Sequence, residues 1–246
     1  MKRLFLASVA ATGVSSATFA ADMSVSPVKV PPIVMPPPFF NWIGFYVGGN
    51  IGGGFNDIDF SNTNTVTGAP TGSNSANIAG VTGGGQIGYN SIILPHLLAG
   101  FEADISGADI NGTAISPDGS AQHTFNTDLF GTARARFGLT YNNWLFYGSG
   151  GFAWGEERVT RNQLTGRTRA AVAGTSETVS TTGTGWAAGG GIEWGFMPNW
   201  TARIEYLYVD LGTYCCAFPL AGRTTTSDYA FNVVRFGINY RLSSGP

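Results

Sequence analysis

Ten charged side chains fall on the same face of a set of alternating segments, and they are the residues whose types could do chemistry together. Five are acidic and five are basic: Glu102, Asp104, Asp128, Glu193 and Glu205, and Arg134, Arg136, Arg203, Arg235 and Arg241. Charges enclosed between strands must pair or lose their charge, because burial penalises the isolated ionised form. The pattern therefore predicts a network of ion pairs. A gated path for protons or small ions is the alternative, if the arginine side chains move aside.

Residue types that support catalysis or metal binding are otherwise scarce. The chain has two histidines: His96 lies in a predicted turn, and His123 lies in a predicted outer loop with Asp109 and Asp118 nearby in sequence. Neither histidine belongs to a zinc-binding spacing, and no nucleophile can be identified to accompany His123. We therefore expect no enzyme activity and no metal site.

Two further motifs receive structural interpretations. Cys215 and Cys216 are adjacent in a predicted outer loop, which predicts a labile vicinal disulfide or two thiols, and an exported location favours oxidation. Glycine runs at residues 48–54 and, in part, 83–88 have a nominal G-x-G-x-x-G spacing. A phosphate site of that kind needs a helix after the glycines, and no helical pattern follows either run. We expect these glycines to permit strand curvature instead.

The elements that must position the charged residues are β-strands. From Phe39 onward the chain shows no long 3.6-residue pattern, but eight segments, each roughly ten residues long, alternate apolar with small or polar residues. Long polar links at residues 56–76, 107–124, 156–180 and 211–226 alternate with short links at 90–96, 142–143 and 197–199. This alternation predicts eight antiparallel strands with long loops outside the cell and short turns in the periplasm.

Composition indicates which face of the strands points outward. Charged residues make up 11% of the chain, whereas soluble domains carry roughly 25%. The apolar faces end in aromatic residues such as Phe45, Trp144, Trp194 and Tyr240, as in the girdles of membrane barrels. The predicted fold class is therefore all-β: an eight-stranded antiparallel transmembrane β-barrel, with the apolar face toward lipid and the charges inside. A net charge of −2 argues against nucleic-acid binding.

The ends of the chain carry separate signals. Lys2 and Arg3, an apolar stretch and small residues up to Ala20 predict a signal peptide over residues 1–20. The proline-rich residues 21–40 predict an extended periplasmic leader. Residues 41–242 are predicted to form the barrel, and residues 243–246 a C-terminal tail. We expect export to the outer membrane of a Gram-negative cell.

Three segments resemble a known family. The stretch PPPFFNWIGFYVGGNIGGGF at residues 36–55 is similar to the first strand of the OmpA-like eight-stranded barrels known as alphaproteobacterial outer-membrane surface antigens. TARIEYLYVDLG at residues 201–212 resembles their seventh strand, with the inward pair Arg203 and Glu205, and VVRFGINYRL at residues 233–242 resembles their closing strand. The resemblance covers about residues 36–242.

The resemblance implies an abundant, surface-exposed structural protein that contributes to envelope integrity, and the ion pairs predict a plugged lumen without a cofactor. Some members of the family bind haemin, so one alternative is capture of haemin or another small ligand by the outer loops through His123 and Tyr214. A narrow small-solute pore is a further alternative. The expected partners are outer-membrane lipids, lipopolysaccharide and the barrel-assembly machinery. The sequence does not identify any host or surface ligand.

Overall fold

The computed structural model describes residues 40–116, 118–165 and 170–242. The predicted signal peptide, nearly all of the leader and the predicted tail lie outside these ranges. No helix within them is both long and apolar enough to cross a membrane.

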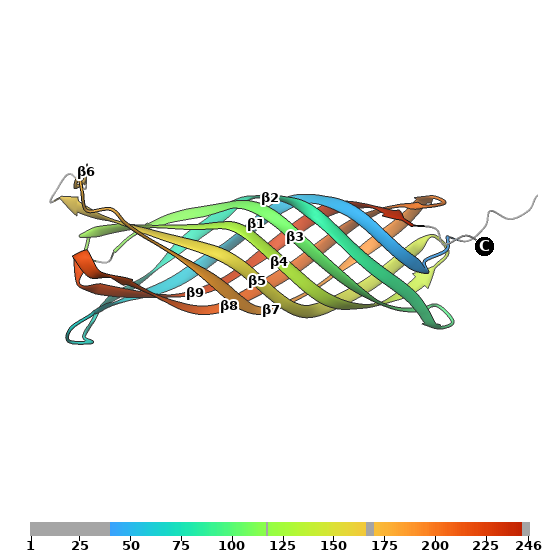
Figure 1. The fold of residues 1–246 in the computed structure, drawn as a ribbon, viewed down its shortest axis with the longest axis horizontal. Helices are drawn as coiled ribbons and strands as arrows, with labels where there is room; N and C mark the ends of the chain where they lie inside the picture. The colour runs from blue at the N-terminus through green and yellow to red at the C-terminus, as the bar shows by residue number, and fades with distance from the viewer. Residues whose placement is uncertain (1–39, 117, 166–169, 243–246) are drawn as a thin grey trace, which may run out of the picture. The chain divides into compact units, whose positions relative to one another are not determined.

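Eight long antiparallel strands make up the described chain. They are β1 (Gly44–Asn64), β2 (Pro70–Leu94), β3 (Leu97–Ile115), β4 (Ala121–Tyr141), β5 (Trp144–Thr165), β7 (Glu177–Met197), β8 (Trp200–Phe218) and β9 (Arg223–Arg241). A two-residue strand, β6 (Ala170–Ala171), pairs with β5, and a 3-10 helix, η1 (Pro219–Ala221), precedes β9. Each long strand pairs with the next one along the chain, and β1 pairs with β9, so the sheet closes into a barrel (Figure 1). The predicted fold class is confirmed.

The strands are about twice as long as predicted, because most of each long polar link continues the strand before or after it. In β1 the link includes Asp57-Ile58-Asp59-Phe60, where both aspartates are exposed while Ile58 and Phe60 are buried. The alternation therefore continues in these outer parts of the strands, because every second residue still points into the barrel. Here the inward residues are apolar and the outward residues are polar, the reverse of the pattern within the part that was predicted.

An apolar belt surrounds the half of the barrel that lies nearest the short turns. We call the end of the barrel with the short turns its lower end and the opposite end its upper end. Exposed aromatic pairs mark the lower edge of the belt, where ring centroids lie 4.8 Å apart for Phe45 and Tyr89 and 4.9 Å apart for Trp200 and Tyr240. Trp186 and Tyr208, 5.3 Å apart, mark its upper edge. Beyond them most of the outward-facing residues are polar or charged, so the outside of the barrel has an apolar zone and a water-compatible zone.

The interior shows the opposite arrangement. Within the belt, the inward side chains are mostly charged or polar, apart from a small apolar cluster near the short turns that includes Leu98 and Leu145. Beyond the belt they form an apolar core, which we call the upper core; its large members include Ile58, Phe60, Ile78, Ile110, Phe125, Phe130, Phe218, Tyr229 and Phe231. The two interior zones therefore match the two exterior zones with inverted polarity.

Candidate functional site: an ion-paired lumen

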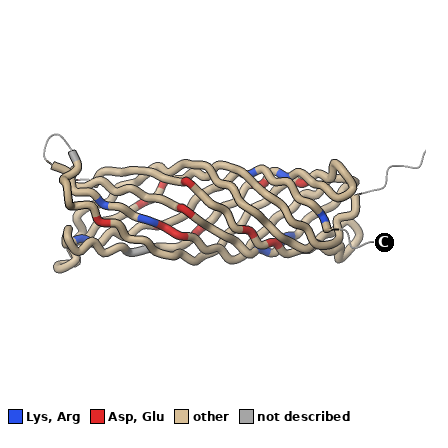
Figure 2. The backbone as a smooth tube through the Cα atoms, turned by 45° about the horizontal axis from the view of Figure 1, so that its top comes forward, with Lys and Arg blue, Asp and Glu red and all other residues tan. Residues whose placement is uncertain are grey.

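Strand register places opposite charges next to each other inside the belt. Glu102 on β3 lies opposite Arg134 on β4, and Glu205 on β8 lies opposite Arg235 on β9. Acidic and basic positions accordingly lie side by side on neighbouring strands (Figure 2). Because side chains alternate between faces, each of these pairs points into the lumen together.

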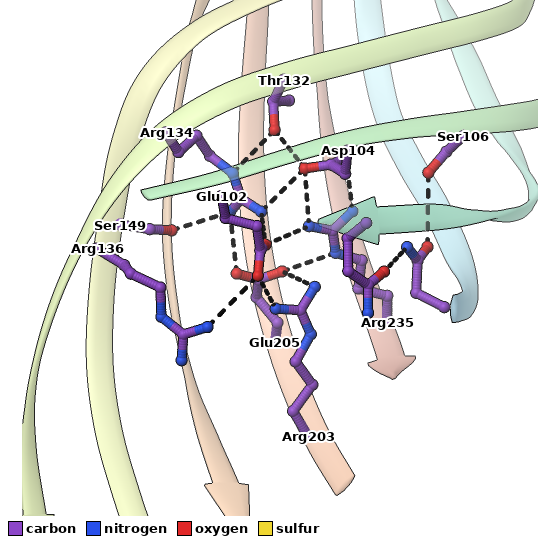
Figure 3. Close-up of polar contacts among 12 residues, drawn as sticks. Glu102, Asp104, Ser106, Thr132, Arg134, Arg136, Ser149, Arg203, Glu205 and Arg235 are labelled. Carbon is purple, nitrogen blue, oxygen red and sulfur yellow. Dashed lines mark hydrogen bonds and ion pairs between the residues drawn. The ribbon is translucent and has the colours of Figure 1, made fainter. Parts of the chain in front are cut away.

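Arg134 is the centre of the resulting network (Figure 3). Its guanidinium donates to Glu102 at 2.7 Å, to Asp104 at 3.1 Å and to Glu205 at 2.9 Å. Arg235 contacts the same three carboxylates, Asp104 at 3.0 Å, Glu205 at 2.7 Å and Glu102 at 3.8 Å. Shared carboxylates link the two arginines into one network rather than separate pairs.

Glu102 joins this network to residues nearer the short turns. Arg203 forms an ion pair with Glu102, and Arg136 approaches the same carboxylate at 3.4 Å. The hydroxyl of Tyr46 donates to Glu102 at 2.7 Å. The Tyr46 ring lies over Gly88, where an added Cβ would stand 2.3 Å from the ring. A glycine is therefore needed at position 88 for Tyr46 to reach the network.

A second layer forms around Glu193 and Arg136. Arg136 donates to Glu193 at 2.6 Å, and the same carboxylate accepts from Thr201 at 2.5 Å and from Asn239 at 2.9 Å. The Arg136 guanidinium lies 4.2 Å from the ring centroid of Tyr147, which adds a cation–π contact.

Four arginines and four acids thus meet in the lumen. They are Arg134, Arg136, Arg203 and Arg235, and Glu102, Asp104, Glu193 and Glu205. Their side chains are at most 4% exposed. The group is electrically neutral, and hydrogen bonds supplement the ion pairs, which is the arrangement that burial of so many charges requires.

Apolar side chains lie inside the barrel on both sides of this network. The upper core fills the barrel above it. Below it, Trp42 is buried against Leu98, Leu145 and Tyr147, and Phe40 packs on Trp42 with ring centroids 4.6 Å apart. Phe40 and Trp42 precede β1, so the segment that leads into the barrel also covers its lower opening.

Two of the ten predicted lumen residues lie elsewhere. Asp128 is on the outside of β4, where its carboxylate pairs with Arg158 at 3.2 Å. The register shifts between Thr127 and Leu129, and this β-bulge turns Asp128 outward. Arg241 lies at the lower rim and donates to the carbonyl oxygens of Ile43 and Pro198 instead of to a carboxylate.

The predicted ligand-binding loop residues also differ from expectation. His123 was expected in a solvated loop, but it lies in β4, is 1% exposed and faces the upper core, with Nε2 3.2 Å from the Ser116 hydroxyl. Tyr214 belongs to β8, as does Cys216, which is buried. The structure does not describe the side chains of Tyr214 and Cys215, so the vicinal disulfide stays a prediction.

An exposed charge pair lies at the outer rim. Asp118 pairs with Arg223 at 3.3 Å and accepts hydrogen bonds from the Ser120 amide at 3.0 Å and hydroxyl at 2.7 Å. Partial burial tends to raise the pKa of Asp118, but the hydrogen bonds from Ser120 outweigh it and lower the pKa. The carboxylate therefore stays ionised at neutral pH and connects the β3–β4 turn to β9.

Several participants in the lumen were not predicted because they are uncharged. Tyr46, Thr132, Tyr147, Thr201 and Asn239 all contact the charged group. The sequence feature that could have identified them is their position along the strand. Each lies an even number of residues from a charged lumen residue or on the inward face of its own strand. Within the described ranges, no group of three or more histidine, cysteine, aspartate and glutamate side chains is arranged to hold a metal ion.

The fold and the polar lumen inside an apolar belt define the class of the protein. Residues 37–241 match the outer membrane protein beta-barrel domain family, and the chain belongs to that family. It is an outer-membrane β-barrel of a Gram-negative bacterium.

Relatives support a more particular grouping. The chain is 34% identical to the 31 kDa outer-membrane immunogenic protein of Brucella melitensis over 254 residues, covering 98% of this chain and all of the relative. It is 29% identical to a 22 kDa outer membrane protein of Rhizobium leguminosarum, covering 83% and 80% of the two chains. The expected resemblance to surface-antigen barrels is confirmed.

Solved structures show the same fold at low identity. The outer membrane protein OprG of Pseudomonas aeruginosa is similar with a TM-score of 0.53 and 13% identity, covering 82% of this chain and 99% of that one. At this identity the similarity is one of fold alone.

Proposed function

We propose that this protein is a structural, surface-exposed component of the outer membrane whose lumen is closed and does not act as a steady channel. The observation that supports this function is the neutral network of four arginines and four acids. Its arginines contact the same carboxylates, and apolar side chains lie above and below the network. An ion would have to break several buried pairs to pass, at a cost of a few kcal/mol for each.

The proposed role includes no catalysis. The relatives above carry names of immunogenic or outer-membrane proteins rather than of enzymes, and a surface-antigen role for this chain rests on that similarity. The proposal includes contact of the apolar belt with outer-membrane lipids and lipopolysaccharide, which its exposed aromatic residues support. It also includes insertion by the barrel-assembly machinery.

Conductance tests the closed lumen. The refolded protein, reconstituted in planar bilayers, should show no steady conductance, whereas Arg203→Ala should raise the leak because it opens the ion pair with Glu102. Asp128→Asn is the matched control, since Asp128 lies outside the barrel. Large, steady channels in the unmodified protein that Arg203→Ala does not change would refute the closed lumen and favour a pore.

Envelope integrity is tested in cells. A strain that lacks the protein should become more sensitive to detergent, and expression of the unmodified chain should reverse the effect. Equal sensitivity with and without the protein would remove the structural part of the proposal.

A further inference from the structure

An apolar groove lies on the outside of the belt, along the join between β1 and β9 that closes the barrel. Its volume is about 680 Å³. Four of its lining residues are glycines, and exposed apolar or aromatic side chains stand around them: Val47, Ile51, Trp200, Phe236, Ile238 and Tyr240. Trp200 and Tyr240 form an aromatic pair at the lower edge of the belt. The lower end of the groove therefore lies at the level of the membrane interface.

Gly49 is the glycine that keeps this groove open. It is exposed on the outward face of β1. An added Cβ at Gly49 would have one neighbour within 4 Å, the carbonyl oxygen of Gly84 at 3.6 Å, which is an ordinary contact. At the inward-facing Gly48, an added Cβ would stand 2.5 Å from the carbonyl oxygen of Ile238. Packing of the barrel therefore requires a glycine at position 48 but not at position 49, where a side chain would fill the groove instead.

The position of the groove restricts what can occupy it. The belt faces the hydrocarbon of the membrane, where the available molecules are lipid acyl chains and the belts of other proteins. Exchange of one acyl chain for another gains nothing from the hydrophobic effect, so an ordered chain must gain from closer van der Waals contact. A groove with glycines at its floor and rings at its lower end provides more such contact than a convex wall does.

A positive charge lies at the lower end of the groove. Arg241 directly follows Tyr240 in the chain. Its guanidinium donates to the carbonyl oxygens of Ile43, just before β1, and Pro198, in the β7–β8 turn, each at 3.2 Å. Within the described residues it pairs with no carboxylate, and the exposed acids of the same residues lie at or beyond the upper edge of the belt. The lower rim therefore complements an anionic headgroup.

We propose that the groove binds one acyl chain of a phospholipid whose anionic headgroup lies at Arg241. The inference rests on the proposed contact of the belt with lipid and identifies one site within that contact. A second copy of the chain fits less well. Copies in one membrane share one orientation, so a neighbouring copy would bring another positive lower rim, rather than an acid, to Arg241.

Lipid retention tests the site on the refolded protein in a mild nonionic detergent. Native mass spectrometry counts bound palmitoyl-oleoyl phosphatidylglycerol, which is anionic, and the phosphatidylcholine with the same two chains, which has no net charge. We expect saturable binding of one phosphatidylglycerol. Its binding should be about fivefold tighter than that of phosphatidylcholine, which is the effect of one basic residue near an anionic group.

Variants separate the groove from the charge. Gly49→Leu should weaken binding of both lipids about fivefold, because the new side chain occupies the groove. Gly150→Leu is the matched control: Gly150 faces outward on β5, on the opposite side of the barrel, and an added Cβ there would meet one carbonyl oxygen at 3.7 Å. Arg241→Gln should remove the preference for phosphatidylglycerol and leave phosphatidylcholine binding unchanged, whereas Arg241→Lys should keep the preference.

A phosphatidylglycerol with a diazirine on its palmitoyl chain tests the location. After photolysis, the label should be attached to the lining of the groove, at residues 47–51, 84, 200 or 236–240. Gly49→Leu should reduce this labelling, and Gly150→Leu should leave it unchanged.

Several results would overturn the proposal. Equal binding of the two lipids by the unmodified protein would remove the role of Arg241. Equal effects of Gly49→Leu and Gly150→Leu, or labels outside the lining, would place the lipid elsewhere. Absence of saturable binding would show that the groove holds no lipid, and a dimer that Gly49→Leu disrupts would show that a second copy occupies it. Conductance of the same samples judges the closed lumen independently.

Discussion

Replacement of Arg134 by alanine should be among the most damaging single changes in the lumen. The side chain of Arg134 is fully buried and contacts the carboxylates of Glu102, Asp104 and Glu205 at 2.7–3.1 Å. Each carboxylate keeps another arginine, since Arg235 contacts Asp104 and Glu205 and Arg203 contacts Glu102. The lumen is nonetheless left with one excess negative charge. We expect a loss of about 3–5 kcal/mol in the free energy of unfolding, the range for breaking a buried ion pair.

Arg134→Lys should recover part of this loss, because one ammonium keeps the charge but cannot reproduce the guanidinium's contacts with three carboxylates. The double variant Arg134→Met with Glu205→Gln restores neutrality and should be more stable than Arg134→Ala. The measurement is reversible urea unfolding in lipid vesicles, followed by tryptophan fluorescence.

Arg158→Ala is the reference variant, because the Arg158–Asp128 pair is about half exposed and should contribute less than about 1 kcal/mol. If Arg134→Ala costs no more than Arg158→Ala, the buried ion pairs of the network do not stabilise the barrel.

Three further predictions concern the wall of the barrel. Ile204→Arg should cost roughly 2–4 kcal/mol in urea unfolding if position 204, which is exposed within the apolar belt, lies near the bilayer midplane. In a cysteine-free background, Thr67→Cys should react with an impermeant maleimide on intact cells, whereas Asn143→Cys should not. Gly131→Val should destabilise by about 1–3 kcal/mol through overpacking, because an added Cβ would stand 2.8 Å from the Trp154 ring; Trp154→Ala should reduce that cost in a double-mutant cycle.

Each of these has a control or a contrary result. Thr182→Arg, on the water-facing part of β7, should change stability by less than about 0.5 kcal/mol; equal effects of Thr182→Arg and Ile204→Arg would contradict the position of the belt. Labelling of Asn143→Cys alone would invert the topology. Additive effects at Gly131 and Trp154 would show that the ring does not lie over the glycine.

The fold within the belt was predictable because one rule governs it. Inward charges and outward apolar residues alternate without interruption around Glu102 and Arg134, so period and composition together identify strands, faces and the ion pairs. Asp128 escaped the rule because a β-bulge adds one residue and changes the parity of the strand beyond it. A bulge of this kind leaves no residue type that distinguishes it in a sequence.

The outer half was not predictable for a different reason. Polar links such as Asp57-Ile58-Asp59-Phe60 have the composition of loops, and their alternation indicates strand only if the inside of the barrel is allowed to become apolar. The same inversion buries His123, which a polar loop context had placed in water. Arg134 and Arg235 have carboxylate partners on strands that are distant in the sequence. These residues meet only when the barrel closes, and a local sequence pattern carries no information about that closure.

The outer extension of the barrel consists of strands rather than loops, and this restricts how its surface can change over evolutionary time. With a rise of about 3.3 Å per residue and a tilt of about 40°, the eight residues from Asp57 to the end of β1 carry the rim about 20 Å beyond the belt. Their outward side chains contact water and their inward ones pack in the upper core. Tolerated variation should therefore follow a period of two along the walls, so that a new surface can evolve on an unchanged interior without altering loop length.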